Sequence, residues 1–423
     1  MLLIKEIREN GESIKKKLRK RAFQETELID IIIDLDEKRR SIKRELDDLL
    51  NRTKMRSKEI GNLYKVGKRE DAEQMKKEMI SLKDQVRALE DEYRKVELEI
   101  EDILVRIPNL PHESVPAGTT DADNLVIKEG GAMPLLPEGA LTHWDLAVKF
   151  DLIRFEEGTK ITGSGFPVFS GMGARLQRAL VNFFLDRAIK AGYHEYSPPL
   201  LVNKESAFAT GQLPDKDGQM YYINEDDLYL IPTAEVPLTN LYRNKLLKEE
   251  DLPQKLVGYT PCFRREAGSY GKDVRGLNRL HQFDKVEIVQ IAHPEKSYDV
   301  LQQMMAHVES LIIDLELPYR ILRLCGGDLG FTSALTYDFE VYSAAQKKWL
   351  EVSSVSNFES FQANRLKLRF KDSNGENRLL HTLNGSALAF PRIIAALLEN
   401  GQKKDGIQMP TALHPYLGFE LIA

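Results

Sequence analysis

The sequence has very little cysteine: Cys262 and Cys325 are the two cysteines among 423 residues. Two lone cysteines form no CxxC pair and no disulfide framework, which is typical of a reducing, cytoplasmic compartment. The eight histidines are scattered, and none belongs to an HxxxH or Cys-His set with zinc-ligand spacing. The sequence therefore predicts no structural zinc site, and we interpret both thiols as ordinary buried side chains.

Long apolar runs and nucleotide-loop motifs are also missing. The first ten residues, MLLIKEIREN, become charged at once, so no signal peptide is expected, and no apolar run approaches membrane-spanning length. Neither GxGxxG nor GxxxxGKS/T occurs, which excludes the Rossmann and P-loop modes of nucleotide binding. A net charge of -5 does not by itself predict a nucleic-acid or membrane partner.

Two heptad runs dominate the N-terminal part of the chain. The first repeats every seven residues from Leu28 to Leu63, and the second runs from Ala72 to Ile107 in steps of three and four. A sustained 3.5-residue repeat predicts a coiled coil, and a short connection containing Gly67 predicts an antiparallel helical hairpin. Each arm of about 36 residues would reach roughly 54 Å, so we expect it to project into solvent.

The charge of this hairpin is graded along its length. Residues 52–69 carry seven bases and one acid, whereas residues 84–102 carry eight acids and three bases. A salt-bridged dimerisation coil would be mixed throughout, whereas a basic far tip on an acidic protein favours RNA or DNA. The expected contacts are the tip bases Arg52, Lys54, Arg56, Lys58, Lys65, Lys68 and Arg69.

Proline marks the end of the hairpin, because it disfavours a helical conformation in the residue before it. Residues 108–140 are rich in proline and glycine. We therefore expect an N-terminal domain at 1–107 with its coiled-coil arm at about 28–107, a linker at 108–140 and a globular domain at 141–423. The globular part sets a few helices among many consecutive strands, which predicts an α+β fold with a mostly antiparallel sheet flanked by helices.

The stretch from Tyr259 to Ile291 predicts a β-hairpin with a long polar loop at 267–278. If the first strand continues through Glu266, alternation places Arg264 and Glu266 on one face and Arg265 on the other. The returning strand places four residues on one face: Phe283, Lys285, Glu287 and Val289. A long loop costs closure entropy and more often binds a ligand than merely connects strands. Taken by itself, this stretch is equally consistent with a nucleotide-binding site and with a surface hairpin whose charges are solvated.

Several segments match the signature motifs of one enzyme class. FRREAG with RGLNRLHQFDKVE, the helix at 171–190 with its following Pro199, and LNGSALAFPR resemble the three motifs of class II aminoacyl-tRNA synthetases. The coiled-coil arm, TAEVPLTN and EVSSVSNFESFQANR narrow the resemblance to the seryl-tRNA synthetases. It covers essentially the whole chain, and it is to the bacterial type without zinc-binding insertions.

The resemblance implies an enzyme that activates L-serine with ATP and Mg²⁺ and transfers serine to the terminal adenosine of tRNA(Ser). Members of the family commonly also charge tRNA(Sec), which this sequence does not decide. The implied enzyme is a homodimer, with the first-motif helix and strand in the interface. The arm tip would bind the tRNA across subunits, by its shape and backbone, and the loop at 267–278 would close over ATP and the tRNA acceptor end.

Two other interpretations stay open. An aminoacyl-adenylate ligase that loads a carrier protein would share the catalytic motifs, but such relatives lack the long arm. A non-catalytic RNA-binding paralogue could share the fold, since a fold does not fix function. The intact set Arg264, Glu266, Glu287, Glu351 and Arg392 argues against that paralogue.

The resemblance assigns the catalytic roles to Arg264 and Arg392. Arg264 suits the α-phosphate and the serine carboxylate, because its planar fork bridges oxygens bidentately. Glu266, Leu280 and Phe283 would contact the adenine or orient the arginine. Arg392 would cover the other side of the ring and reach the γ-phosphate; alternatively, it is a helix-surface charge. Pro391 stands where the family often has glycine, which can shift the helix start.

Glu351 and Ser354 resemble the pair that holds magnesium through oxygen ligands. Their spacing of three breaks strand parity, so we expect either a β-bulge between them or an indirect role for one of them.

For serine, Thr233, Glu235 and Glu287 are the candidates for the ammonium, and Arg264 for the carboxylate. Glu287 and Ser386 would bind the hydroxyl, which would reject alanine by leaving polar groups unpaired, whereas threonine must be excluded by size. The sequence predicts a strand at 378–383, a turn at 384–386 and a helix from about Ala387. Ser386 would then be a helix N-cap as an alternative to a ligand, or in addition to that role.

Overall fold

The computed structural model describes residues 1–215, 218–267 and 275–423 of the chain. Two compact units account for the chain: residues 1–19 with 23–108 form the first, and residues 20–22 with 109–423 form the second. In the described residues, no helix combines the length and the apolar character needed to cross a membrane.

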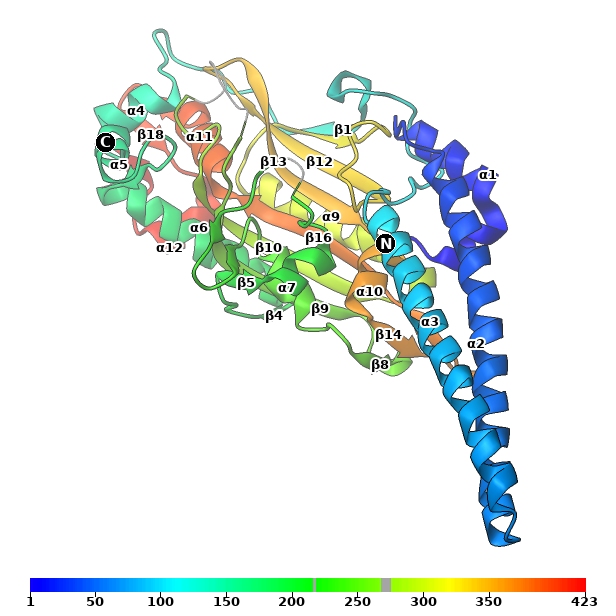
Figure 1. Cartoon of the computed structure of the whole chain (residues 1–423). Coiled ribbons are helices and arrows are strands. Elements are labelled where there is room, and N and C mark those ends of the chain that lie inside the picture. The colour runs from blue at the N-terminus through cyan, green and yellow to red at the C-terminus, as the bar shows by residue number, and fades with distance from the viewer. Residues whose placement is uncertain (216–217, 268–274) are drawn as a thin grey trace. The chain divides into compact units, whose positions relative to one another are not determined.

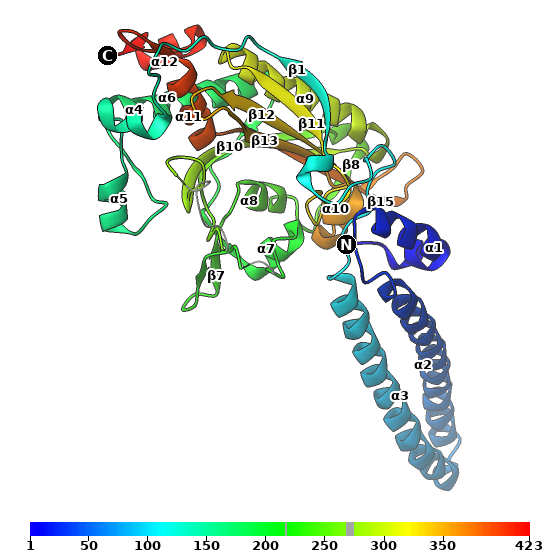
Figure 2. The same ribbon diagram turned by 90° about the horizontal axis from the view of Figure 1, so that it is seen from above.

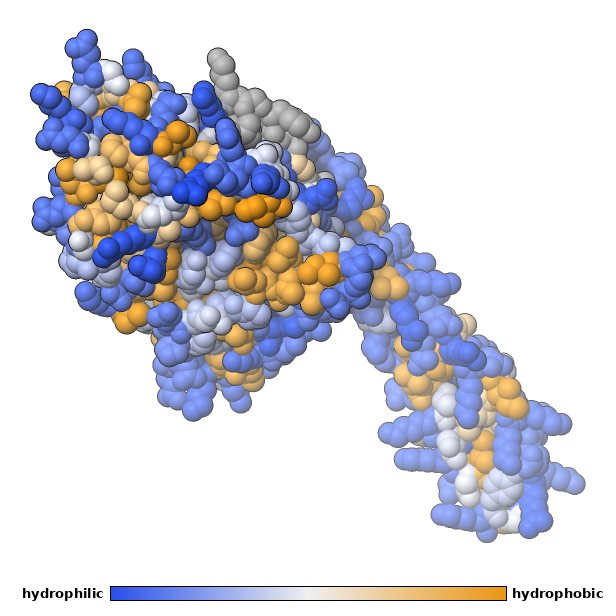
Figure 3. Space-filling model, turned by 90° about the vertical axis from the view of Figure 1, so that its left-hand side faces the viewer, coloured by the Kyte–Doolittle hydropathy of each residue, from blue (hydrophilic) through white to orange (hydrophobic). Residues whose placement is uncertain are grey.

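The first unit is helical and contains α1 (Ile4–Lys20), α2 (Leu28–Lys65) and α3 (Arg69–Leu104) (Figure 1). Helices α2 and α3 pack together as an antiparallel hairpin, and Gly67 adopts a φ of 79° in the turn between them. Ion pairs cross the hairpin at Lys38–Glu92, with 2.9 Å between Nζ and Oε1, and at Arg39–Glu97. The outer surface of this arm is mostly hydrophilic (Figure 3). The predicted helical hairpin is confirmed.

The second unit is built on an eight-stranded sheet with the order β1-β11-β12-β13-β16-β10-β9-β4. Every neighbouring pair is antiparallel except β4 and β9, which run parallel. The predicted α+β class with a mostly antiparallel sheet is therefore confirmed. The strands are β1 (Leu125–Gly130), β11 (Tyr319–Arg323), β12 (Leu335–Ser343), β13 (Lys348–Asn357), β16 (His381–Ala389), β10 (Gln282–Ala292), β9 (Gln254–Phe263) and β4 (His194–Glu195).

Helices cover both faces of this sheet (Figure 2). The helices α6 (Gly171–Lys190), α9 (Ser297–Asp314) and α11 (Phe390–Asn400) form the main hydrophobic core with one face. The helix α8 (Glu235–Asn240) packs on β10 and β9 from the other face, together with α10 (Ser360–Leu366) and α7 (Lys204–Thr210). Along β10, Val286 and Ile288 therefore point into the main core. Of the alternate positions, Lys285 and Glu287 line the site, whereas Val289 and Ile291 pack in a second core with α8 and α10.

Short elements complete the second unit. The helices are α4 (His143–Lys149), α5 (Phe155–Ile161) and α12 (His414–Leu417). The short strands are β2 (Ile153–Arg154), β3 (Val168–Phe169), β5 (Leu201–Asn203), β6 (Tyr222–Ile223), β7 (Leu228–Leu230), β8 (Leu246–Lys248), β14 (Arg369–Lys371), β15 (Asn377–Leu379), β17 (Gln402–Lys403), β18 (Gly406–Gln408) and β19 (Leu421–Ile422).

The predicted turn at 384–386 is wrong. Strand β16 continues through these residues to Ala389, paired with β10 on one side and β13 on the other. Gly385 serves close packing here, because a Cβ at this position would lie 3.2 Å from the side chain of Val355. Helix α11 begins at Phe390 rather than near Ala387, and Pro391 occupies its first turn, where proline is tolerated. Ser386 is consequently a mid-strand residue and not a helix N-cap.

Candidate active site

A cavity of about 870 Å³ lies on the sheet face opposite the main core. Its walls come from the β9–β10 hairpin, from β12, β13 and β16, and from the start of α11. Every residue predicted for ATP, serine or magnesium lines it: Thr233, Glu235, Arg264, Glu266, Leu280, Phe283, Glu287, Glu351, Ser354, Ser386 and Arg392. A space of this size accommodates a nucleotide together with a small amino acid.

One end of the cavity is closed and acidic. Glu287 is 1% exposed, and Lys285 and Glu235 are 5% and 6% exposed. Strand pairing of β10 with β16 sets Glu287 opposite Ser386, whose hydroxyl donates to Glu287 Oε2 at 3.3 Å. Lys285 Nζ lies 2.6 Å from the same oxygen. Gln362 Nε2 donates to Glu235 Oε1 at 2.7 Å.

The two buried carboxylates affect each other. Burial, and secondarily the charge of Glu287, raise the pKa of Glu235 to about 7, although Gln362, Lys285 and Asn384 oppose the shift. Two carboxylates and one lysine ammonium leave this end one negative charge in excess when both acids are ionised. A ligand ammonium would balance that charge, so the closed end suits a small amine.

The other end is more open and rich in arginine. The Arg264 guanidinium lies 5.2 Å from the centre of the Phe283 ring. Arg279 Nη1 lies 3.0 Å from Glu266 Oε2. Strand alternation does not explain this arrangement, because β9 ends at Phe263 and Glu266 has a φ of 48°. The predicted shared face of Arg264 and Glu266 holds, but it results from an irregular segment whose Arg264 N–H donates to the His281 carbonyl.

Arg392 connects the open end to β13. Its Nη1 donates to the Glu351 carbonyl at 2.7 Å, and the same atom lies 3.5 Å from the Glu351 carboxylate. Its Nε donates to the Asn278 carbonyl at 3.2 Å. The guanidinium is thus oriented from two sides within the cavity, which is the geometry that a phosphate-binding arginine needs.

The predicted bulge between Glu351 and Ser354 is confirmed. The β12–β13 register shifts between Phe339 and Glu340, so that Val352 has no counterpart on the neighbouring strand. This puts Glu351 and Ser354 on one side, with 3.4 Å between Ser354 Oγ and Glu351 Oε1.

The oxygens around this bulge fit a hard cation such as magnesium. Burial, followed by the charge of Glu351, raises the pKa of neighbouring Asp338 well above its usual value, and its Oδ1 has no hydrogen-bond partner in the described residues. No group of three or more Asp, Glu, His or Cys side chains in the described ranges could hold a metal. Magnesium would therefore need nucleotide oxygens or water molecules as further ligands.

Sequence reasoning missed several polar residues that line the site or bond its side chains. Strand alternation placed Lys285 on the same face as Glu287, but no role was predicted for it. Asn384 was hidden by the predicted turn, although in a strand it shares a face with Ser386. Arg279, Gln362 and Asp338 gave no local signal, because they come from separate elements. The predicted covering loop at 267–278 lies partly outside the described residues, which omit 268–274.

Comparison with known proteins identifies the family of the chain. The seryl-tRNA synthetase N-terminal domain model matches residues 1–111, and the tRNA synthetase class II core domain (G, H, P, S and T) matches residues 221–401. The serine–tRNA ligase of Salinibacter ruber is 51% identical over 424 aligned positions, covering 100% of this chain and 99% of that protein. The chain belongs to the seryl-tRNA synthetase family.

Other family members match over their full lengths. The serine–tRNA ligase of a Hydrogenobaculum species is 48% identical, with 100% of both chains covered. The crystal structure of the Pyrococcus horikoshii seryl-tRNA synthetase, complexed with ATP, superposes with a TM-score of 0.93 at 35% identity, covering 100% of this chain and 99% of that one. The Naegleria fowleri cytoplasmic enzyme, in complex with AMP, gives 0.88 at 30% identity, covering 100% and 98%.

Proposed function

We propose that this protein activates L-serine with ATP to seryl-adenylate and then transfers the seryl group to the 3′-terminal adenosine of tRNA(Ser). One observation carries the proposal: a single cavity joins a buried pocket with two carboxylates to an open end with arginines and an aromatic ring. Solved family members bound to ATP and to AMP support a nucleotide in this fold.

Positioning and charge stabilisation supply the chemistry of the first step. The serine carboxylate attacks the α-phosphorus of ATP, and pyrophosphate leaves. Arg264 would hold the carboxylate and the α-phosphate together, and Phe283 with Leu280 would support the adenine. Arg392, held by the Asn278 and Glu351 carbonyls, would bind the terminal phosphate. Glu266, which is paired with Arg279, would accept from the adenine amino group.

The closed end would select serine. Glu235 and Glu287 would receive the ammonium, with Thr233 beside them, and Glu287 with Ser386 would bind the hydroxyl. The Lys285 ammonium, with its Nζ 2.6 Å from Glu287 Oε2, would offset part of the negative charge of this buried pocket. Alanine would leave these groups unpaired, which costs more than the loss of one contact.

Glu351 and Ser354 would hold Mg²⁺ at the open end. The ion would neutralise charge on the phosphates while they are displaced. Arg392 lies 3.5 Å from the Glu351 carboxylate, so two positive groups would lie around the same phosphates.

The arm of the first unit would bind the tRNA. Six of its seven predicted tip bases are exposed, and Arg56 is half-buried beside Glu59 and Glu78. Exposed bases that share a helix tip suit an RNA backbone. A homodimer that binds tRNA across its subunits, charging of tRNA(Sec) and a cytoplasmic location also belong to this proposal.

Serine-dependent exchange of pyrophosphate into ATP tests the activation step. Pure protein with ATP, magnesium and serine should catalyse the exchange without tRNA. An absence of exchange would rule out the proposed enzyme and favour an RNA-binding paralogue. Transfer of the product to a carrier protein rather than to tRNA(Ser) would instead favour the adenylate ligase.

A deletion of Arg40 to Val96 tests the arm. The ion pair between Arg39 and Glu97 has 3.8 Å between Nη1 and Oε1, so a short glycine linker can join the cut ends. The shortened protein should keep the exchange activity and lose tRNA charging. Undiminished charging would show that the arm does not bind the tRNA.

A further inference from the structure

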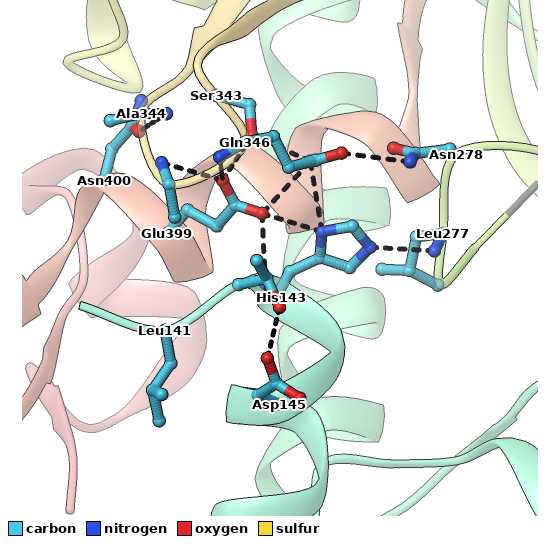
Figure 4. A network of polar contacts seen from close by, with 12 residues as sticks. Leu141, His143, Asp145, Leu277, Asn278, Ser343, Ala344, Gln346, Glu399 and Asn400 are labelled. Atoms are coloured by element: carbon cyan, nitrogen blue, oxygen red, sulfur yellow. Dashed lines mark hydrogen bonds and ion pairs between the residues drawn. The ribbon is translucent and has the colours of Figure 1, made fainter. Parts of the chain in front are cut away.

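Figure 4 shows a buried polar network, two of whose residues, Leu277 and Asn278, also line the open end of the cavity, where the nucleotide is proposed to bind. Its centre is His143, the first residue of α4, which is fully buried together with Glu399 of α11. The two side chains meet with 2.9 Å between His143 Nδ1 and Glu399 Oε1. Neither residue lines the cavity, and the proposed mechanism does not use them.

Both ring nitrogens of His143 are occupied. The Leu277 N–H donates to Nε2 at 2.9 Å. Nε2 is therefore the acceptor and Nδ1 carries the proton, which it donates to Glu399. The imidazole thus connects a buried carboxylate of α11 to a backbone amide of the segment Arg275–Asn278, which precedes Leu280 and Phe283 of the nucleotide end.

Glu399 is held as an anion. Burial by itself would raise its pKa, but hydrogen bonds from His143 and Ser343 outweigh burial and lower it. The Ala345 and Gln346 N–H groups each donate to Glu399 Oε2 at 3.2 Å. Such a fully bonded buried carboxylate is a rigid anchor, because moving it would leave several polar groups unpaired.

The segment Arg275–Asn278 is fastened at further points. A Cβ on Gly276 would lie 2.3 Å from His143 Nε2, and Gly276 has a φ of 68°, so glycine is required against the ring. The Arg275 guanidinium lies 4.8 Å from the centre of the Trp144 ring. Asn278 Nδ2 donates to Gln346 Oε1 at 3.0 Å, which ties the segment back to the same network.

The segment in turn orients Arg392. The Asn278 carbonyl accepts from Arg392 Nε at 3.2 Å. Arg392 and Glu399 are seven residues apart on α11, so they lie on one face of the helix, two turns apart. The helix therefore contacts the segment twice: through Arg392 directly, and through Glu399 by way of His143.

We propose that His143 is a positioning residue for ATP: by binding the Leu277 amide, it fixes the Asn278 carbonyl that aims Arg392 at the phosphates. This inference rests on the proposed function for the identity of the nucleotide. It predicts an effect on ATP that is separate from any effect on serine, because the closed end of the cavity receives no contact from this network among the described residues.

Two substitutions of His143 by amide side chains distinguish its hydrogen bond with Leu277 from its hydrogen bond with Glu399. In His143→Gln the amide oxygen takes the place of Nε2 and can still accept from Leu277, whereas in His143→Asn the amide takes the place of Nδ1 and can bond only Glu399. Loss of the Leu277 bond in His143→Asn should weaken ATP binding about tenfold, the cost of one unpaired buried group. His143→Gln should stay close to wild type, and the serine KM should change in neither variant.

The measurements are calorimetric titration with ATP and magnesium, serine and ATP KM values from pyrophosphate exchange, and thermal unfolding. His381→Gln is the matched control, because it removes another histidine contact, the partly buried one with Ser297 at 2.8 Å, and should change neither KM. Equal losses of ATP affinity in both His143 variants, or a serine KM that rises in step, would reduce His143 to a structural role and overturn the proposal.

Gly276→Ala provides a second route if His143→Asn does not fold. The added methyl would collide with His143 Nε2 and push the segment away from the ring, so ATP binding should weaken as it would in His143→Asn. Unchanged ATP binding would overturn the proposal. The calorimetric readout needs no serine. A wild-type protein that binds ATP without serine-dependent exchange would contradict the proposed function alone.

Discussion

The two ends of the cavity are built on different principles. At the closed end, sheet register positions Lys285, Glu287 and Ser386, whereas Glu235 begins helix α8, and both carboxylates are almost completely buried. At the open end, Arg392 is held by two backbone carbonyls and Arg279 is paired with the Glu266 carboxylate, and both arginines remain partly exposed. At the closed end, burial makes unpaired polar groups costly, which suits discrimination between small substrate side chains. At the open end, positive charge near solvent suits phosphates, which stay partly hydrated.

Removing the residue that serves both ends should have the largest effect. Arg264→Ala should lower kcat/KM for exchange by about 10²–10³-fold, since a donor aimed at developing charge is lost. Arg264→Lys should recover little, because a point charge does not replace the planar fork. Steady-state exchange kinetics measure both, and a loss confined to the KM of one substrate would show that Arg264 serves one end only.

Glu287→Gln should separate the two ends. The serine kcat/KM should fall by about 10²-fold, because hydrogen bonds to a buried charged group are lost and Lys285 is left without its partner. The ATP KM should stay close to wild type. Substrate titrations in the exchange assay give both values, and equal losses for serine and ATP would mean that the role of Glu287 is assigned incorrectly.

Phe283→Leu should act on the open end alone. Loss of base stacking should raise the ATP KM about fivefold, since stacking on one aromatic ring is worth about 1–3 kcal/mol. Leucine preserves most of the apolar contact, so the serine KM should not change. Unaltered ATP titrations would place the adenine elsewhere in the cavity.

The smallest expected effect is the change of the serine KM with pH near neutrality. The pKa of Glu235 is raised to about 7, and a ligand ammonium favours the ionised form. The serine KM should therefore rise as the pH falls below 7, approaching about tenfold per pH unit where only the ionised form binds. The KM of Glu235→Gln should be high but insensitive to pH, and a flat wild-type profile between about pH 6 and pH 8 would contradict this assignment.

The sequence predicted the face of strand β10 better than the irregular segments of the site, for a physical reason. Parity along one strand already grouped Phe283, Lys285 and Glu287, because side chains alternate in any strand. Glu266 was predicted to lie beside Arg264 because of strand alternation, but the strand ends before it. Its left-handed backbone could not be predicted, since the residue is neither glycine nor asparagine. The bulge at Val352 was predictable only because two expected ligands had incompatible spacing.

Contacts between distant elements were beyond sequence reasoning. Asn384 was misplaced because Asn-Gly-Ser favours a turn locally, whereas pairing on both sides holds it in a central strand. His143 and Glu399 are 256 positions apart, and neither belongs to a motif with local spacing. The helical arm, by contrast, needs only local periodicity, and its prediction as a helical hairpin was correct.

The most direct test of this account compares serine with alanine in the pyrophosphate exchange assay of the wild-type protein. The closed end is expected to recognise the hydroxyl through Glu287 and Ser386, so alanine should be at least about 10²-fold poorer than serine in kcat/KM. Exchange that is equally efficient with alanine would show that the buried end does not select serine through its hydroxyl.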